Sequence, residues 1–136
     1  MKKLTFLLLI TLVVGCRKEK DVLPEQVKSF VGNWEQTAFE NSKLEWVDTP
    51  TDGKPSLIVR FDGVLLNGDG LAICCAPENL TVNGVSFKAE PTSPIPYNEA
   101  CTRIDCLLCQ LVKVQVDKDE MIWSGCGGRT RYRRLP

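Results

Sequence analysis

Leu80-Thr81-Val82-Asn83-Gly84-Val85-Ser86-Phe87 is the stretch of this 136-residue chain that decides its fold class. Asn83-Gly84 stands between two short runs with β-branched or aromatic side chains. An Asn-Gly pair in that setting is the strongest short-range signal for a β-hairpin with a two-residue turn. The stretch therefore predicts two antiparallel strands joined by a tight turn.

The rest of the chain repeats this alternation of short apolar runs and turns. Turn signals such as Asp62-Gly63 and a proline-rich loop at residues 91–96 separate the runs. Only residues 23–27 predict a short helical turn, because Pro24 and Glu25 suit its start. Further strands are expected at residues 32–40, 56–62, 70–75, 111–116, 121–124 and 129–135. Strands at this spacing predict an all-β fold, either a barrel or a sandwich of antiparallel strands.

The beginning of the chain has the pattern of an export signal. Two lysines precede the apolar run at residues 4–14, and the small residue Gly15 follows it. This run is too short to span a bilayer as a helix, which takes roughly 20 residues. The sequence Val13-Val14-Gly15-Cys16 resembles the lipobox of bacterial lipoproteins. The resemblance implies removal of a signal peptide at residues 1–15 and diacylation of Cys16, so that a lipid anchors the mature chain to a membrane.

The segment after Cys16 is charged and predicts a tether. Arg17-Lys18-Glu19-Lys20-Asp21 has no apolar periodicity and is expected to be solvated. Residues 16–28 are therefore interpreted as the lipid-anchored tether, and residues 29–136 have the length of one domain. The segment lacks the acidic cluster that directs some related lipoproteins to the cell surface. We therefore expect the anchor in the periplasm-facing leaflet of the outer membrane. The chain carries 17 basic and 17 acidic side chains, which leaves no basic excess for nucleic-acid binding.

Six cysteines remain once Cys16 is assigned to the lipid. An even number in a small exported domain predicts a disulfide framework. Cys74 and Cys75 are expected to have different partners, because adjacent cysteines make a strained bridge and neighbouring strand residues point to opposite faces. The alternative is a zinc site, since three of the six have ligand-like spacing: Cys101, Cys106 and Cys109. The full set is Cys74, Cys75, Cys101, Cys106, Cys109 and Cys126.

The chain offers little catalytic chemistry. It contains no histidine, which removes Ser–His and Cys–His pairs and histidine metal sites. Glu35, Glu40 and Glu45 are the acid–base groups that a barrel mouth could present, but nothing in the sequence places two of them together. We therefore expect a protein without enzymatic activity, resident metal or cofactor.

Both ends of the domain resemble the small lipocalin-like lipoproteins of bacteria. Phe30-Val31-Gly32-Asn33-Trp34-Glu35, after a short helical turn, is similar to the Gly-x-Trp opening of lipocalin-like barrels. Trp123-Ser124-Gly125-Cys126 and Arg131-Tyr132-Arg133-Arg134-Leu135 resemble the closing strand of that group. Ile122 stands where the group has a further cysteine, so Cys126 needs another partner. The resemblance implies a small antiparallel up-and-down β-barrel of about eight strands.

In such a barrel the first and last strands pair with each other. This pairing would bring Trp34 to the strand that carries Arg131 and Arg133. We expect one arginine of that strand over the indole, where it contributes ~0.5–2 kcal/mol, and the others in solvent. The alternative is an anion-binding patch on one face of the strand. The arginines concerned are Arg129, Arg131, Arg133 and Arg134.

The barrel interior is the remaining candidate for function, because an interior of this size holds side chains or one small ligand. The lipocalin resemblance makes Trp46, in the first long connection, a lid over a ligand; a strand that packs into the core explains it equally well. We expect a small apolar or amphiphilic ligand to contact Trp46, Phe61 and Phe87. The alternative is a structural or interaction domain, which acts with another envelope protein and whose core is filled by Phe39, Phe61, Phe87 and Trp123.

Overall fold

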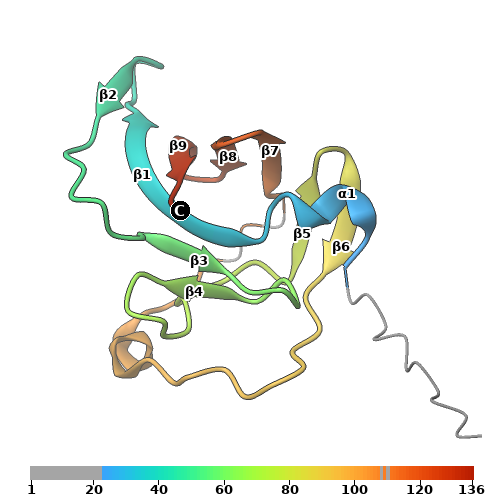
Figure 1. Cartoon of the computed structure of the whole chain (residues 1–136). Helices are drawn as coiled ribbons and strands as arrows, with labels where there is room; N and C mark the ends of the chain where they lie inside the picture. Colours follow the sequence, from blue (N-terminus) through green and yellow to red (C-terminus); the bar gives the residue numbers. More distant parts are fainter. Residues whose placement is uncertain (1–22, 108, 110) are drawn as a thin grey trace, which may run out of the picture.

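The fold is a β-sheet that curls over on itself, with one short α-helix at an end. The computed structural model describes residues 23–107, 109 and 111–136, so the expected signal peptide (residues 1–15) and Cys16 lie outside the described residues. The sheet wraps round as a half-barrel (Figure 1). The described part of the chain is all-β, as the sequence predicted.

Nine strands follow the helix α1 (Glu25–Lys28) in chain order. They are β1 (Gly32–Glu40), β2 (Trp46–Asp48), β3 (Leu57–Val59), β4 (Leu65–Asn67), β5 (Asn79–Val82), β6 (Val85–Lys88), β7 (Lys113–Asp117), β8 (Glu120–Gly125) and β9 (Gly128–Arg134). The 3-10 helix η1 (Glu99–Arg103) lies in the long connection between β6 and β7. Within the described ranges, neither helix has the length and apolar character needed to cross a bilayer.

The Asn83-Gly84 turn forms as predicted. β5 and β6 pair antiparallel with Val82 opposite Val85, which leaves Asn83 and Gly84 as the two turn residues. Their φ angles of 48° and 83° are left-handed, a conformation that asparagine and glycine adopt at low cost. The Asn83 side-chain oxygen also accepts a hydrogen bond from the Val116 N–H at 2.8 Å, which ties the hairpin to β7.

The strand prediction is correct for β1 and wrong for residues 70–75. β1 covers the predicted range. Residues 70–75 contain only an isolated bridge, between Ala72 and Leu66, and the strand β4 lies earlier in the chain. The reason is the side chain of Asn67, whose oxygen accepts a hydrogen bond from the Leu71 N–H at 2.9 Å and turns the chain out of the sheet.

Strand order departs from an up-and-down barrel at one pair. The sheet runs β4-β3-β1-β9-β8-β7-β5-β6, and β2 pairs with β1 beside this path. The first and last strands pair, as predicted, with Trp34 opposite Arg134. β5 and β7 are parallel, with Thr81 opposite Lys113, so the prediction of a purely antiparallel sheet is wrong at this pair. A parallel pair needs a long crossover, and the connection between β6 and β7 supplies it.

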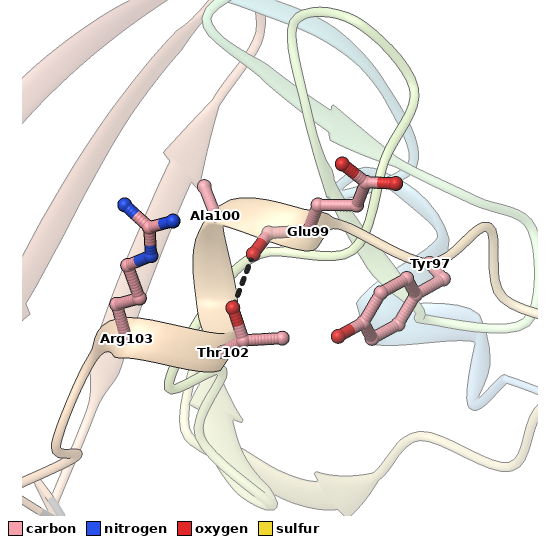
Figure 2. Close-up of a pocket in the computed structure, with 5 residues that line it drawn as sticks. All are labelled: Tyr97, Glu99, Ala100, Thr102 and Arg103. Atoms are coloured by element: carbon pink, nitrogen blue, oxygen red, sulfur yellow. Dashed lines mark hydrogen bonds between the residues drawn. The ribbon is translucent and has the colours of Figure 1, made fainter.

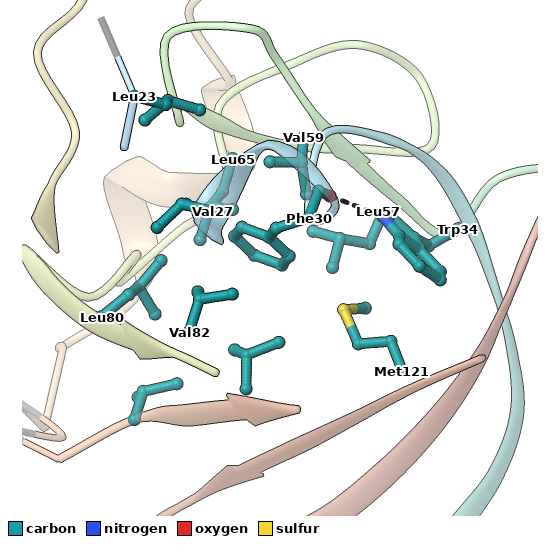
Figure 3. Packing of buried hydrophobic residues seen from close by; sticks show 12 residues of the cluster. Leu23, Val27, Phe30, Trp34, Leu57, Val59, Leu65, Leu80, Val82 and Met121 are labelled. Carbon is teal, nitrogen blue, oxygen red and sulfur yellow. Dashed lines mark hydrogen bonds between the residues drawn. The ribbon is translucent and has the colours of Figure 1, made fainter. Parts of the chain in front are cut away.

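The inside of the curled sheet holds one apolar core that α1 covers (Figure 3). Val27 of α1 and Phe30 after it pack with Trp34 of β1 and Met121 of β8, and all four are fully buried. The Trp34 indole N–H donates to the Phe30 carbonyl at 2.9 Å, so its polar atom is satisfied within the core. The other buried members are Leu23, Leu57, Val59, Leu65, Leu80, Val82, Val112 and Val114.

Candidate functional site

The centre of the half-barrel is filled by side chains. Phe30 and Phe87 meet edge to face with their ring centroids 6.4 Å apart. Phe30, Trp34 and Met121 are fully buried members of one cluster (Figure 3). Trp123 packs against this core, as predicted. The hollows at the margin of the core are therefore the candidates for a ligand site.

The three residues predicted to contact a ligand have different surroundings. Phe87 packs against the core, whereas Phe61, on the turn between β3 and β4, is 64% exposed. Trp46 begins β2 and lies under Arg129 and Arg131, whose guanidinium carbons are 5.3 and 4.5 Å from its ring centroid. The structure therefore does not bring these rings together on one ligand surface.

Two of the four residues predicted to fill the core are exposed instead. Phe39, near the end of β1, is 41% exposed, and Phe61 is more so. The prediction that both point inward is wrong. Phe39 lies opposite Val47 of β2, which is itself exposed, so alternation along the strand does not bury it.

An apolar groove lies where the sheet stays open, between β4 and the β5–β6 hairpin; we call it the edge groove. β4 and β6 are the two ends of the described strand order, so no neighbouring strand covers this side. The groove has a volume of about 260 Å³. Its inner wall contains Val64, Leu65 and Leu80, all of which are buried. Its other apolar lining residues are Ala72, Ile73, Ala76, Pro77, Ala89, Pro91 and Ile95.

The chemistry of the edge groove suits a small molecule with an apolar body. Aliphatic walls favour binding of an apolar ligand, because contact between them removes apolar surface of both from water. Lys88 and Glu78 also line the groove, and their charged ends are 3.6 Å apart and exposed. A polar head group of either sign finds a charged partner at this rim. The groove therefore fits an amphiphilic ligand of modest size.

The edge groove opens beside the first described residue of the domain. A Cβ atom at Gly63 would meet a side-chain carbon of Leu23 at 3.1 Å and one of Phe87 at 2.8 Å, so the β3–β4 turn lies directly against both. Gly63 also has a φ of +81°, a left-handed conformation. Only glycine combines this backbone conformation with so close an approach. The groove consequently lies at the end of the molecule where the described chain begins.

A buried carboxylate fixes the turn at the rim of the groove. Asp62 is fully buried, and its two oxygens accept hydrogen bonds from the Arg60 guanidinium. One of them also accepts hydrogen bonds from the Thr92 N–H at 2.9 Å and the Thr92 hydroxyl at 3.1 Å. Burial alone would raise the pKa of Asp62, but Arg60 and the other donors outweigh it and hold the pKa well below its usual range.

The same guanidinium joins the two sides of the open sheet. Arg60 donates to the carbonyls of Ser93 and Pro94, each at 3.2 Å. These residues follow β6 at some distance along the chain, whereas Arg60 and Asp62 lie between β3 and β4. We call the group Arg60, Asp62 and Thr92 the clamp. Strand pairing leaves one side of the half-barrel open, and the hydrogen bonds of the clamp close that side.

The arginine that covers Trp34 is Arg134 rather than Arg131 or Arg133. Its guanidinium carbon lies 4.3 Å from the ring centroid, and it donates to the Val31 carbonyl at 2.8 Å. Strand register explains the difference, because Trp34 lies opposite Arg134 and directly opposed residues share a face of the sheet. Arg133, one position away, points to the other face.

Two of the glutamates considered for acid–base chemistry are paired with arginines. Glu35 accepts hydrogen bonds from Arg133 at 2.7 Å and from the Gly53 N–H at 2.6 Å, and Glu40 accepts two from the Arg129 guanidinium, at 3.0 and 2.5 Å. Hydrogen bonding to arginine lowers the pKa of both carboxyls, whereas a general acid needs a raised pKa. The prediction that the other arginines lie in solvent is wrong for Arg131, which lies half-buried over Trp46, and correct for Arg129 and Arg133, which are exposed although they pair with carboxylates. Because these arginines have carboxylate partners, an anion-binding patch is also disfavoured.

The six cysteines of the domain form three disulfides: Cys74–Cys101, Cys75–Cys106 and Cys109–Cys126. The prediction that Cys74 and Cys75 have different partners is confirmed. The three candidate zinc ligands lie in three separate disulfides, so the zinc interpretation is wrong. Ile73, Ala76 and Pro77 flank the adjacent pair of cysteines and line the edge groove, so the disulfides hold one wall of that groove in place.

A wider hollow beside η1 is a poor ligand site. Its volume is about 540 Å³, and Figure 2 shows the five residues that line it: Tyr97, Glu99, Ala100, Thr102 and Arg103. All five come from one short segment, and the Thr102 hydroxyl donates to the Glu99 carbonyl of the same helix at 2.8 Å. Because one segment forms the whole lining, the hollow has no opposing wall that would bury a ligand.

The sequence pattern does not reveal the residues that build the edge groove and the clamp. Asp62-Gly63 predicts only a turn, although the arginine two residues before the aspartate is a signal for a local ion pair. Ala76 and Pro77 carry no signal at all, because disulfides to distant residues place them. Comparison of the chain with protein-family models, with curated proteins and with solved structures gives no match, so the geometry alone supports the candidate site.

Proposed function

We propose that this protein is a non-catalytic, lipid-anchored and lipocalin-like protein of the bacterial cell envelope that binds a small apolar or amphiphilic molecule in the edge groove. Its anchor is the diacylated Cys16, which remains after removal of residues 1–15. The anchor is seated in the periplasm-facing leaflet of the outer membrane. The observation that carries the proposal is the apolar lining of the edge groove, which is continuous with the core at Leu65 and Leu80.

The closure of the sheet supports a lipocalin-like fold. β1 and β9 pair, and Arg134 lies over the tryptophan of the Gly-x-Trp opening. The glycine of that opening, Gly32, has a φ of +141°, and a Cβ atom there would lie 2.7 Å from the Arg134 guanidinium. Glycine at this position therefore lets the arginine reach Trp34. The parallel pairing of β5 with β7 is a departure from a purely up-and-down barrel.

The size and rim of the edge groove support the class of ligand. Apolar contact contributes roughly 25 cal/mol for each Å² removed from water, so a compact hydrocarbon body gains several kcal/mol when the walls cover it. Lys88 and Glu78 at the rim favour a ligand whose head group stays in water. An enclosed ligand of drug size needs a larger cavity than this groove offers. The proposal is therefore restricted to small molecules or to one short segment of a longer amphiphile.

A fluorescent amphiphile tests the groove directly. Ala76 is an exposed residue of the groove lining, so Ala76→Phe should fill the groove without disturbing the core. We expect the purified chain to enhance the emission of anilinonaphthalene sulfonate and Ala76→Phe to lose most of that enhancement. The matched control is Ala100→Phe, a change of the same size at an exposed alanine of η1, which should keep it. Equal emission from both variants would contradict the edge groove as the site.

The anchor has its own test. Cys16→Ser removes the thiol that accepts the acyl chain, so we expect the variant to accumulate as unprocessed or detergent-soluble material while the parent partitions with membranes. Native mass spectrometry of protein purified from its own host then identifies any small molecule that copurifies with it. A Cys16→Ser variant that stays fully membrane-bound would contradict the lipid anchor.

The filled core favours a second candidate function, that of a structural or interaction domain acting with another envelope protein. A hollow of about 340 Å³ lies beside the Cys109–Cys126 disulfide, with Trp123 and Leu107 in its lining. Leu107 is 96% exposed, so its side chain is available to a partner. Crosslinking in the host, with Leu107→Asp compared with Ala76→Phe, separates the two functions. A crosslinked protein partner lost only in Leu107→Asp would favour the interaction domain.

A further inference from the structure

The turn between β3 and β4 has an inverted arrangement of polar and apolar side chains. Asp62 is fully buried and the Arg60 side chain is only 14% exposed, whereas Phe61 between them is 64% exposed. A buried charge is uncommon in a folded protein, whereas a single exposed apolar side chain is not. Here the two stand next to each other in the chain, so the turn places an aromatic ring in solvent while burying its charged neighbours.

The clamp prevents the ring from turning inward. On one side of Phe61, the Arg60 N–H donates to the Val64 carbonyl, and on the other the Gly63 N–H donates to the Arg60 carbonyl, each at 2.9 Å. The side chain of Asp62 is bound to Arg60 and Thr92. Moving Phe61 into the core would bring Asp62 out and separate a buried ion pair, which is costly. The outward position of the ring is therefore a fixed property of the turn.

A second apolar side chain lies near the clamp. Arg60 donates to the carbonyls of Ser93 and Pro94, which brings the proline-rich loop against the turn. Ile95, the next residue of that loop, is exposed and also lines the edge groove. Phe61 and Ile95 thus belong to two segments that the same guanidinium joins. We call these two side chains the apolar tip.

The turn between β3 and β4, which carries Phe61, lies near the start of the described chain (Figure 1). Gly63, two residues after Phe61, approaches Leu23 so closely that a Cβ atom would stand 3.1 Å from it. Seven positions separate Leu23 from Cys16, and a chain of that length spans at most about 25 Å. A lipid on Cys16 would therefore keep this end of the domain within reach of the bilayer surface.

We propose that the apolar tip inserts into the membrane interface and sets the orientation of the anchored domain, with the edge groove open toward the lipid. The inference rests on the proposed anchor at Cys16. Aromatic side chains favour the interface between head groups and acyl chains, so the Phe61 ring would add a second point of membrane contact beside the acylated Cys16. Ile95 of the apolar tip and the nearby Gly63 both line the groove, so an amphiphile leaving the bilayer reaches the groove without crossing open water.

Quenching by brominated lipid tests this orientation. The lipidated protein is reconstituted into phosphatidylcholine vesicles whose acyl chains carry bromine, with a tryptophan added at the tip by Phe61→Trp. The matched control is Phe39→Trp, a change of the same type at an exposed phenylalanine near the far end of β1. Emission of each variant is compared with the parent, so that the three native tryptophans cancel. We expect loss of most of the added emission for Phe61→Trp and little loss for Phe39→Trp.

Flotation of the same vesicles separates the inference from the proposals on which it rests. Protein that floats and is quenched more strongly at position 61 than at 39 supports the apolar tip. Protein that floats with equal quenching, or stronger quenching at position 39, overturns the tip while leaving the anchor intact. Protein that does not float overturns both. Dye binding to the edge groove is measured separately, without vesicles. A result that contradicts the groove therefore does not affect the comparison of quenching at positions 61 and 39.

Discussion

The curled sheet and the connection between β6 and β7 are stabilised by different means. Twelve buried apolar residues hold the sheet around α1, whereas no described residue between positions 89 and 111 is buried. That connection instead contains three of the six cysteines, one from each of the three disulfides. A segment whose described side chains are not buried gains little from folding against its neighbours, and covalent links replace that gain by restricting the unfolded chain. We therefore expect the curled sheet to be destabilised by loss of buried apolar side chains and the connection to be destabilised by loss of disulfides.

The largest expected effect is on the apolar region. Trp34→Ala removes a fully buried ring and leaves the Arg134 guanidinium without its aromatic partner, so we expect a loss of ~3–5 kcal/mol in the free energy of unfolding. Urea unfolding under oxidising conditions measures it. Trp46→Ala is the control, since Trp46 lies outside the described core cluster, and should cost much less. Equal unfolding midpoints for Trp34→Ala and the parent would show that this end of the sheet is not closed by packing.

The next effect concerns the disulfide region. The Cys75–Cys106 bond closes a separation of 31 residues, so the double change Cys75→Ser and Cys106→Ser should cost ~3–4 kcal/mol in the chain-entropy model. Hydrogen exchange locates the loss. We expect faster exchange at the Ala72 N–H, which donates to the Pro96 carbonyl, while amides between β8 and β9 stay protected. Equal loss of protection in β8 and β9 would mean that the two regions fold as one unit.

The clamp joins the two regions and gives a smaller, pH-dependent effect. Asp62→Asn leaves Arg60 and Thr92 with a weaker hydrogen-bond acceptor. We therefore expect the free energy of unfolding to fall by ~1–3 kcal/mol near neutral pH. Because the pKa of Asp62 is lowered in the folded state, its ionised form contributes stability above the unfolded pKa of about 4, and that contribution is lost as the pH falls toward the folded pKa.

The difference between Asp62→Asn and the parent should therefore shrink as the solution is acidified below about pH 4. Thermal unfolding at several pH values measures this trend. The control is Asp117→Asn at an exposed position of β7, which should show a much smaller difference throughout. A difference for Asp62→Asn that stays constant down to strongly acid pH would contradict the role of the ionised clamp.

The smallest expected effect is at Arg131, which lies over the partly exposed ring of Trp46. Arg131→Ala should lower the free energy of unfolding by only ~0.5–1 kcal/mol, because the contact between the guanidinium and the ring is open to solvent. Arg134→Ala should cost more, since that guanidinium also donates to carbonyls of residues that lead into β1. Denaturant unfolding of the two variants ranks them. The reverse order would place the closure of the sheet at Trp46 instead of Trp34.

Several features of the fold follow from residues that are close in the sequence. Asn83-Gly84 forms the predicted two-residue turn because both residues accept left-handed backbone angles. The run at residues 32–40 becomes β1, and Cys74 and Cys75 take different partners because adjacent cysteines are poorly placed to bond each other. Backbone preference and covalent geometry act over a few residues, so a local pattern carries enough information to predict these features.

The remaining features depend on residues that are far apart in the chain. Arg134 covers Trp34 because of the register between β1 and β9, and that register shifts at a bulge between Gln36 and Ala38. Phe61 points outward because the neighbouring Asp62 finds Thr92 thirty residues away. A charged side chain is buried only where its hydrogen-bond partners converge, and no local pattern encodes that convergence. The pairing of cysteines, the edge groove and the clamp were therefore decided by the tertiary structure.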